Sequence, residues 1–187
     1  MIQANIANFT NYDNDKVNFI SMGRLTYQKG FDRLLNWFSN IENKESVLRI
    51  IGNGPMENEL KDLVQKLNLS SRVIFLGYMD NPWSLIAASD VFLLSSRWEG
   101  MPNAALESLV CGTPVIATSE SGGIIELSKY SKKGAVIVTS SELEFSEEMK
   151  KIKYKNNKKF KNSLLPQKYC LDNAIEVFND QLKAEIS

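Results

Sequence analysis

The stretch DVFLLSSRWEGMPNAALESLVCGTPVIA, residues 90–117, contains a complete strand, helix and strand pattern. Its first apolar run predicts a buried parallel strand, and the run that starts at Pro114 predicts another. Between them, Glu99 and Glu107 flank a turn that enters a helix with a proline. Two carboxylates so placed indicate a polar site. Glu99 is expected near the carboxyl end of a strand, where α/β proteins bind ligands.

The same alternation of apolar runs and segments of helical period covers most of the chain, which is typical of strand–helix units around a parallel sheet. The predicted strands are Val17–Met22, Val47–Ile51, Val73–Leu76, Asp90–Leu94, Pro114–Ala117 and Ala135–Val138. The predicted helices are Phe31–Ile41, Pro55–Leu67, Pro82–Ala88 and Pro102–Val110, with a short helix after Gly123. We therefore predict an α/β fold: a Rossmann-like, doubly wound parallel sheet of about six strands with flanking helices.

The two ends of the chain depart from this pattern. Residues 1–15 are rich in Asn and lack apolar periodicity, so we expect the remnant of an interdomain linker there and one domain over 16–187. After the last strand we expect a charged helix from Ser141 to about Ile152 and a polar stretch rich in Lys and Asn. A final amphipathic helix is expected at about 166–184, where it would cover the sheet or dock on a missing partner.

Composition restricts the class of function. A chain of 187 residues, 43% hydrophobic and 24% charged, can bury one substantial core. Its 22 basic and 22 acidic residues give no net charge, which argues against a nucleic acid partner. The sequence has no histidine and two cysteines, so this chain alone cannot form a histidine base or a Cys/His zinc cluster. We predict no metal site and no cofactor.

Localisation is predicted from two further features. No apolar run approaches the roughly 20 residues that span a bilayer, and the polar start lacks a signal-peptide pattern. We therefore expect a cytoplasmic protein. The Lys-rich run at 150–161 leaves peripheral attachment of the full-length protein to the inner face of the membrane open, since basic clusters bind anionic lipid. A solvated helix face is the favoured explanation of that run.

Three predicted strands are followed by polar loops with glycines, and we expect these loops to converge on one edge of the doubly wound sheet. Two of the loops carry groups suited to phosphate. Arg24 and Lys29 follow the first strand, and Arg can fork onto phosphate oxygens while Lys supplies a compact charge. A solvated loop explains them equally well. Gly52 and Gly54 follow the second strand, where missing side chains would let a ligand approach the backbone of a helix N-terminus. The alternative for these glycines is a turn without a ligand.

The two glutamates also admit two explanations. Glu99 could simply favour the N-terminus of the following helix, and Glu107 could lie on an exposed helix face. However, Glu107 is placed in a nearly apolar helix. A carboxylate there needs a hydrogen-bond partner, and the hydroxyls of a sugar or ribose would serve.

Taken together, the motifs resemble a known family. They are Gly-Arg-Leu-x4-Gly from Gly23, Gly-x-Gly-Pro from Gly52, Glu-x7-Glu from Glu99, Cys-Gly-Thr-Pro-Val-Ile-Ala from Cys111, and Gly-Gly at Gly122. In this order they are similar to the C-terminal, donor-binding half of a retaining, family-four (group 1) glycosyltransferase of the GT-B fold. The resemblance covers residues 17–138.

The resemblance implies a nucleotide-sugar donor that carries UDP, GDP or ADP and binds without an obligatory metal. Arg24 and Lys29 then correspond to the cations that hold the diphosphate and neutralise charge on the leaving group. Glu99 corresponds to the carboxylate that faces the donor sugar, and completes the implied catalytic set. Glu107 corresponds to the carboxylate that accepts hydrogen bonds from the ribose.

One segment departs from the commonest family pattern. Many members have Glu-Gly-Phe-Gly-Leu-Pro where this chain has Glu99-Gly100-Met101-Pro102-Asn103-Ala104. Because proline cannot donate a backbone hydrogen bond, one amide contact to the donor is lost, and the Asn103 side chain is a candidate replacement. The implied substrate-binding residues are Gly23, Gly52, Gly54, Tyr78 near the nucleobase, Gly100, Met101, Asn103 and Glu107.

Family members also have an N-terminal domain that binds the acceptor, and this chain does not include it. We expect it in the same polypeptide at full length, with a separate subunit as the alternative. The resemblance implies transfer of a hexose or N-acetylhexosamine, most often from UDP, to a glycan, lipid or polysaccharide acceptor with retention. This half alone would be inactive. Two other functions stay open: half of a nucleotide-sugar epimerase, or a nonenzymatic module that binds a nucleotide or a protein.

Overall fold

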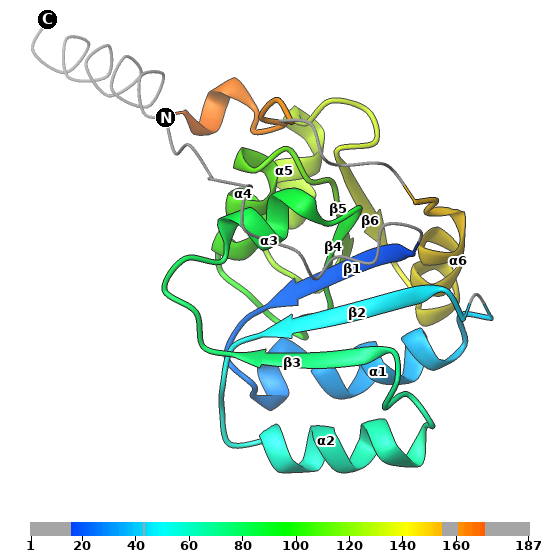
Figure 1. The fold of residues 1–187 in the computed structure, drawn as a ribbon. Helices are drawn as coiled ribbons and strands as arrows, with labels where there is room; N and C mark the ends of the chain where they lie inside the picture. Colours follow the sequence, from blue (N-terminus) through cyan, green and yellow to red (C-terminus); the bar gives the residue numbers. More distant parts are fainter. Residues whose placement is uncertain (1–15, 43, 155–160, 171–187) are drawn as a thin grey trace, which may run out of the picture.

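The computed structural model describes residues 16–42, 44–154 and 161–170. These residues form a parallel sheet with helices on both faces (Figure 1), which confirms the predicted α/β architecture. The strands are β1 (Val17–Met22), β2 (Ser46–Ile51), β3 (Val73–Gly77), β4 (Val91–Leu94), β5 (Val115–Thr118) and β6 (Val136–Thr139). Each predicted strand is present, with bounds that differ by no more than one residue at either end.

The order of the strands is β3-β2-β1-β4-β5-β6, and every neighbouring pair is parallel. The chain therefore builds the sheet outward from β1 in one direction, returns, and builds the other half from β4. Phe19 of β1 pairs with Val91 of β4 at this junction. In such doubly wound sheets, ligands bind in the crevice outside the carboxyl ends of the two central strands.

Within the described residues, three helices pack on each face of the sheet, and alternate strand residues point to opposite faces. The helices are α1 (Phe31–Ser39), α2 (Glu57–Lys66), α3 (Trp83–Ala88), α4 (Asn103–Val110), α5 (Ile124–Tyr130) and α6 (Glu142–Lys151). Helices α1, α2 and α6 pack on one face, and α3, α4 and α5 pack on the other. Phe19 faces the first group, whereas its neighbour Ile20 faces the second.

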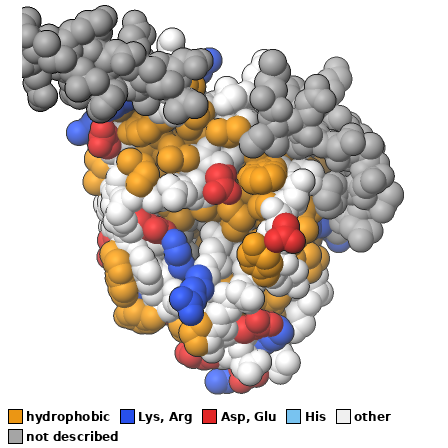
Figure 2. All heavy atoms as spheres, turned by 90° about the vertical axis from the view of Figure 1, so that its left-hand side faces the viewer, with side chains coloured by type: hydrophobic (Ala, Val, Ile, Leu, Met, Phe, Trp, Pro, Cys, Tyr) orange, Lys and Arg blue, Asp and Glu red, His pale blue; other side chains and the backbone are white. Residues whose placement is uncertain are grey.

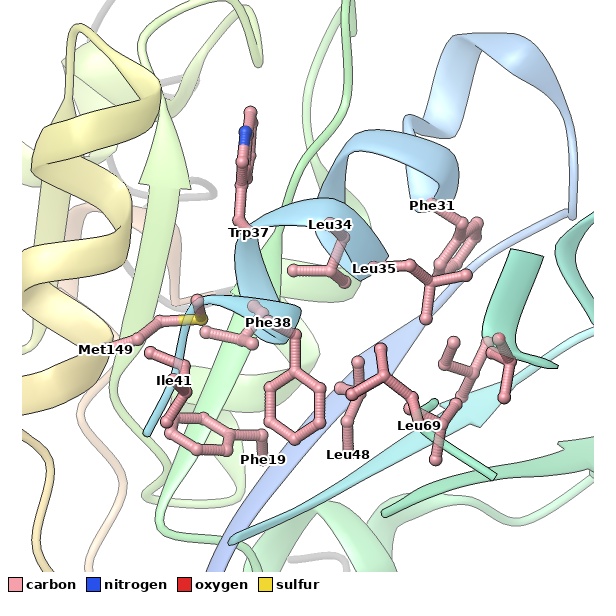
Figure 3. Close-up of a cluster of buried hydrophobic side chains, with 14 of the residues drawn as sticks. Phe19, Phe31, Leu34, Leu35, Trp37, Phe38, Ile41, Leu48, Leu69 and Met149 are labelled. Atoms are coloured by element: carbon pink, nitrogen blue, oxygen red, sulfur yellow. The ribbon is translucent and has the colours of Figure 1, made fainter. Parts of the chain in front are cut away.

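The larger core lies between β1, β2 and α1 (Figure 3). Phe38 of α1 meets Phe19 edge-on, with ring centroids 5.8 Å apart, and both side chains are fully buried. Trp37 packs against Phe145 of α6 with centroids 4.8 Å apart. These contacts of the apolar face of α1 hold the helix against the sheet, so they also position the loop between β1 and the start of α1.

The helix starts correct one detail of the sequence prediction. Pro82 and Pro102 occupy the N-cap positions of α3 and α4, and Pro55 lies two residues before α2, so none is in the first turn. Ser141 caps α6 through its side chain, which accepts a hydrogen bond from the Glu144 amide. Proline is tolerated just before a helix because the amide it lacks has no intrahelical acceptor there.

The two predicted ends fall largely outside the described residues. The linker at 1–15 lies wholly outside them. A helix does not begin at Pro166: a 3-10 turn, Gln167–Tyr169, ends in extended backbone at Cys170, and 171–184 lie outside the described part. Where the structure describes the Lys-rich run, Lys150 and Lys151 pair with Glu147 and Glu148 on α6. None of the helices in the described residues has the length and apolar character needed to cross a bilayer.

Replacement of Phe38 tests the core beneath α1. Phe38→Ala removes a fully buried ring and is expected to lower the free energy of unfolding by about 3–5 kcal/mol. Leu143→Ala is the control, because this side chain is 71% exposed, and should change stability by less than about 0.5 kcal/mol. Urea denaturation of both variants measures the difference. Similar stability of the two variants would contradict the packing described.

Candidate functional site

The loops that follow β1 and β4 lie side by side at the carboxyl edge of the sheet, although 70 residues separate them in sequence. The Gln28 side-chain amide donates to the Trp98 carbonyl at 3.0 Å. In return, the Arg97 amide donates to the Gln28 carbonyl at 2.7 Å. Backbone atoms of both loops take part, so their relative position is fixed by the main chain.

This contact brings two of the predicted site residues together. Lys29 Nζ lies 2.6 Å from Glu99 Oε1, and the side chains are 23% and 9% exposed. The Ser96 hydroxyl donates to the same oxygen at 2.7 Å. The predicted convergence of the two loops is therefore confirmed for Lys29 and Glu99. Both of these donors meet Oε1, so neither of them occupies Oε2.

A second ion pair joins the loop after β4 to the start of α1. The Arg97 guanidinium makes two hydrogen bonds to the Asp32 carboxylate, of 2.8 and 2.7 Å, and lies 3.8 Å over the Tyr27 ring. Burial alone would raise the pKa of Asp32, but the hydrogen bond and charge of Arg97 help to hold it below the usual value. Asp32 belongs to the first turn of α1, so the helix itself is tied to the β4 loop.

Arg33 of α1 binds the backbone just after the end of β4. Its guanidinium donates to the carbonyls of Ser95 at 2.8 Å and Ser96 at 2.7 Å, and pairs with Glu120. The Thr118 hydroxyl adds a further bond of 2.9 Å to the Ser96 carbonyl. Arg33, Ser96 and Arg97 are not among the site residues predicted from the sequence. The placement of Ser96 at a strand end, three residues before Glu99, was the one signal present.

The glycines after β2 have a structural explanation. A Cβ on Gly52 would lie 2.0 Å from the Gly23 carbonyl oxygen, and one on Gly54 would lie 2.4 Å from the Leu25 carbonyl oxygen. The space that these missing side chains leave is therefore filled by the neighbouring loop after β1. Both glycines are therefore explained without a ligand. That backbone groups of Gly23, Gly52 and Gly54 contact a ligand stays a prediction.

Glu107 lies half-buried on α4, and its partner in the structure is Trp83. Burial raises the pKa of this carboxyl, and the hydrogen bond from the Trp83 side chain opposes part of that rise. The exposed-face alternative for Glu107 is therefore wrong. On the next turn of α4, burial and the charge of Glu107 raise the pKa of the Cys111 thiol to about 11, so this thiol is protonated at neutral pH.

The other predicted site residues lie at the rim. Arg24, Gly100 and Asn103 are exposed, and Met101 is 42% exposed. Tyr78 is 69% exposed and hydrogen-bonds to Asp80 of its own loop, which raises the pKa of the phenol. Figure 2 shows this edge of the sheet, with Lys and Arg side chains near its middle and separate acidic and hydrophobic side chains around them. Within the described residues, no three His, Cys, Asp or Glu side chains form a group that could hold a metal.

The backbone after Glu99 rests on a pair of glycines that follows β5. The Gly123 amide donates to the Gly100 carbonyl at 2.8 Å. Gly122 has a positive φ of 59°, and a Cβ there would lie 2.0 Å from the Glu99 carbonyl oxygen. Glycine is required at this position both by its conformation and by the close approach. The carbonyls of Glu99 and Gly100 are thus fixed by a third loop.

Comparison with protein families identifies this arrangement. A model described as glycosyl transferases group 1 matches residues 3–164. The chain belongs to the group 1 glycosyltransferase family. The loops that follow β1 and β4 carry the Gly-Arg-Leu-x4-Gly and Glu-x7-Glu motifs, on which the resemblance to this family was based.

Relatives within this glycosyltransferase family include two with assigned activities. One is the N-acetylgalactosamine-N,N'-diacetylbacillosaminyl-diphospho-undecaprenol 4-alpha-N-acetylgalactosaminyltransferase of Campylobacter jejuni, 28% identical over 88% of this chain and 45% of the relative. The other is the UDP-Gal:alpha-D-GlcNAc-diphosphoundecaprenol alpha-1,3-galactosyltransferase of Escherichia coli, 39% identical over 56% of this chain and 28% of the relative.

A solved structure shares the fold. The lipopolysaccharide outer core galactosyltransferase WaaB in its apo form superposes with a TM-score of 0.74 and 20% sequence identity, over 92% of this chain and 50% of that one. The fold thus corresponds to one half of a GT-B glycosyltransferase. The chain spans half or less of the length of each of these three proteins.

Replacement of Gly122 tests the contact that supports Glu99. Gly122→Ala places a methyl group against the Glu99 carbonyl and also forces alanine into a left-handed conformation. Gly134→Ala is the matched control, because Gly134 has a positive φ of 83° with no atom within 4 Å of the added Cβ. We expect the control to lose about 1–2 kcal/mol of stability and Gly122→Ala to lose at least about 1 kcal/mol more. Equal losses in urea denaturation would contradict the close approach.

Proposed function

We propose that this chain is the donor-binding half of a glycosyltransferase that transfers a hexose or N-acetylhexosamine from a nucleotide-diphosphate sugar. The acceptor is a glycan, lipid or polysaccharide, and the configuration at the anomeric carbon is retained. The observation that carries the proposal is the Lys29–Glu99 pair at the carboxyl ends of β1 and β4. A cation and a carboxylate at the switch point of the sheet suit a ligand with both a phosphate and a sugar.

The chemistry of the donor explains why a cation is needed here. When the glycosyl–phosphate bond breaks, its electron pair stays on the phosphate oxygen, so negative charge grows on the leaving diphosphate. Lys29 is positioned to neutralise that charge, and Arg24 is exposed at the mouth of the same loop. Preorganised cations of this kind stabilise a developing charge without the reorganisation that water would need.

Glu107 is assigned to the ribose. Its carboxylate is half-buried and receives one hydrogen bond from Trp83. An ionised carboxylate offers about four acceptor sites, so it retains capacity for the two ribose hydroxyls. The exposed Tyr78 ring and the loop around it are assigned to the nucleobase, and Gly100, Met101 and Asn103 to the donor sugar.

Support for the donor and acceptor classes comes from the relatives. The name of the Escherichia coli relative gives UDP-galactose as donor, and both named relatives act on diphospho-undecaprenol acceptors. UDP is therefore the first donor nucleotide to test. We assign the acceptor site to the part of the full-length protein outside this chain, and peripheral attachment of that protein to a membrane would bring it to a lipid-linked acceptor. Without that part, the chain binds donor and transfers little, because transfer needs both reactants in one closed cleft.

Calorimetric titration with UDP, GDP and ADP tests the donor site. We expect one nucleotide to bind preferentially. Arg24→Ala and Lys29→Ala should each weaken it about tenfold or more, because each removes a charge-assisted contact to phosphate. Lys132→Ala is the control, since it removes an exposed lysine that precedes β6, at the opposite edge of the sheet. Failure of all three nucleotides to bind the wild-type chain would contradict the proposal.

The raised pKa of Glu107 predicts a pH dependence of nucleotide binding. Ribose hydroxyls donate to the ionised carboxylate, so affinity should fall as pH drops through this raised pKa. Trp83→Phe removes the N–H that favours the ionised form, so the pKa rises further and the fall should begin at a higher pH. Titrations with UDP from about pH 8 to about pH 4 measure the midpoint.

Glu107→Gln is the control for this titration, because it keeps the titration of the ligand's own phosphates and lacks the carboxyl. Its pH profile should lack the fall in affinity that comes from this carboxyl, which wild type shows and Trp83→Phe shows at a higher pH. An identical midpoint in all three proteins would assign the pH dependence to the ligand and contradict the role of Glu107.

A further inference from the structure

The Ser96 hydroxyl is the one neutral donor that the structure places on the Glu99 carboxylate in the described residues. We propose that Ser96 is a positioning residue, which keeps Glu99 directed at the donor sugar when Lys29 turns to the diphosphate. This inference rests on the proposed function, because it assigns the sugar to Glu99 and the diphosphate to Lys29.

The geometry places two donors on one carboxylate oxygen. Lys29 Nζ and Ser96 Oγ lie 2.6 and 2.7 Å from Glu99 Oε1. These two contacts hold Oε1 in place and leave Oε2 for another partner. The Glu99 side chain is 9% exposed, so it cannot exchange these donors freely for water.

Donor binding would remove one of the two contacts. Lys29 carries a compact charge on a flexible stem. That stem lies over Gly23, which has no side chain; a Cβ added there would touch Lys29 Cδ at 3.4 Å. A diphosphate that enters beside Lys29 carries more negative charge than Glu99 and competes for the ammonium group. Glu99 would then be a partly buried carboxylate beside phosphate, and the bond from Ser96 would hold it in place.

Ser96 is fixed strongly enough to do this. The residue is 1% exposed, and its carbonyl accepts hydrogen bonds from Arg33 at 2.7 Å, Thr118 at 2.9 Å and Ser121 at 3.3 Å. These donors come from α1 on one side and from the end of β5 and the loop after it on the other. The Ser96 backbone therefore does not need to move when Lys29 does, and its hydroxyl stays within reach of Glu99.

The test compares affinity for the nucleotide alone with affinity for its sugar conjugates. Titrations use UDP, UDP-glucose, UDP-galactose and UDP-N-acetylglucosamine with the wild-type chain and with Ser96→Ala. We expect Ser96→Ala to bind UDP within about twofold of wild type. It should reduce the ratio of sugar-conjugate to UDP affinity about tenfold or more, the size expected for one hydrogen bond to a charged group. A purely structural role of Ser96 would weaken UDP and its conjugates alike.

Ser95→Ala is the matched control, because it removes an adjacent buried hydroxyl that bonds to the Lys29 carbonyl and not to Glu99. It should leave the ratio of affinities unchanged. A ratio that is the same in wild type and Ser96→Ala, with UDP bound by both, would overturn this inference alone. Absence of UDP binding by the wild-type chain, with GDP and ADP also failing, would overturn the proposed function and this inference with it.

Discussion

The adjacency of β1 and β4 is the constraint on which the rest of the structure depends. Because the sheet grows outward in both directions from this pair, the loops that follow the two strands must share one stretch of the carboxyl edge. Lys29 and Glu99 meet there across 70 residues of sequence. A strand order that separated β1 from β4 would place the cation and the carboxylate at separate points of the edge.

The site keeps its shape because main-chain atoms hold it. The carbonyls of Ser95, Ser96, Glu99 and Gly100 are contacted by the Arg33 guanidinium, by hydroxyls, or by a glycine turn that approaches within van der Waals distance. The Arg24 side chain at the rim is exposed, so a ligand can reach it. A base fixed by the main chain holds the nearby charged groups in position, as electrostatic stabilisation of a leaving group requires.

The strands could be predicted from the sequence because buried parallel strands are continuous apolar runs. Lys29 and Glu99 could be placed near one another because parallel strands end at a common edge of the sheet. The sequence alone could not decide whether Gly52 and Gly54 make room for a ligand or only form a turn. The atoms that approach them belong to the backbone, which is the same for every residue type. Arg33 was missed because its acceptors are carbonyls more than 60 residues away. The helix expected at about 166–184 rests on apolar spacing and stays a prediction, because the described residues reach only the 3-10 turn Gln167–Tyr169 and Cys170 after it.

We propose that one ligand spans the crevice between β1 and β4, with its diphosphate at Lys29 and its ribose at Glu107. A crystal structure of this chain with UDP bound would show where the ligand lies. We expect phosphate oxygens within hydrogen-bond distance of Lys29 Nζ and ribose hydroxyls on the Glu107 carboxylate, with Ser96 still bonded to Glu99. UDP bound at the opposite edge of the sheet, or at this edge without contact to Lys29 and Glu107, would contradict it.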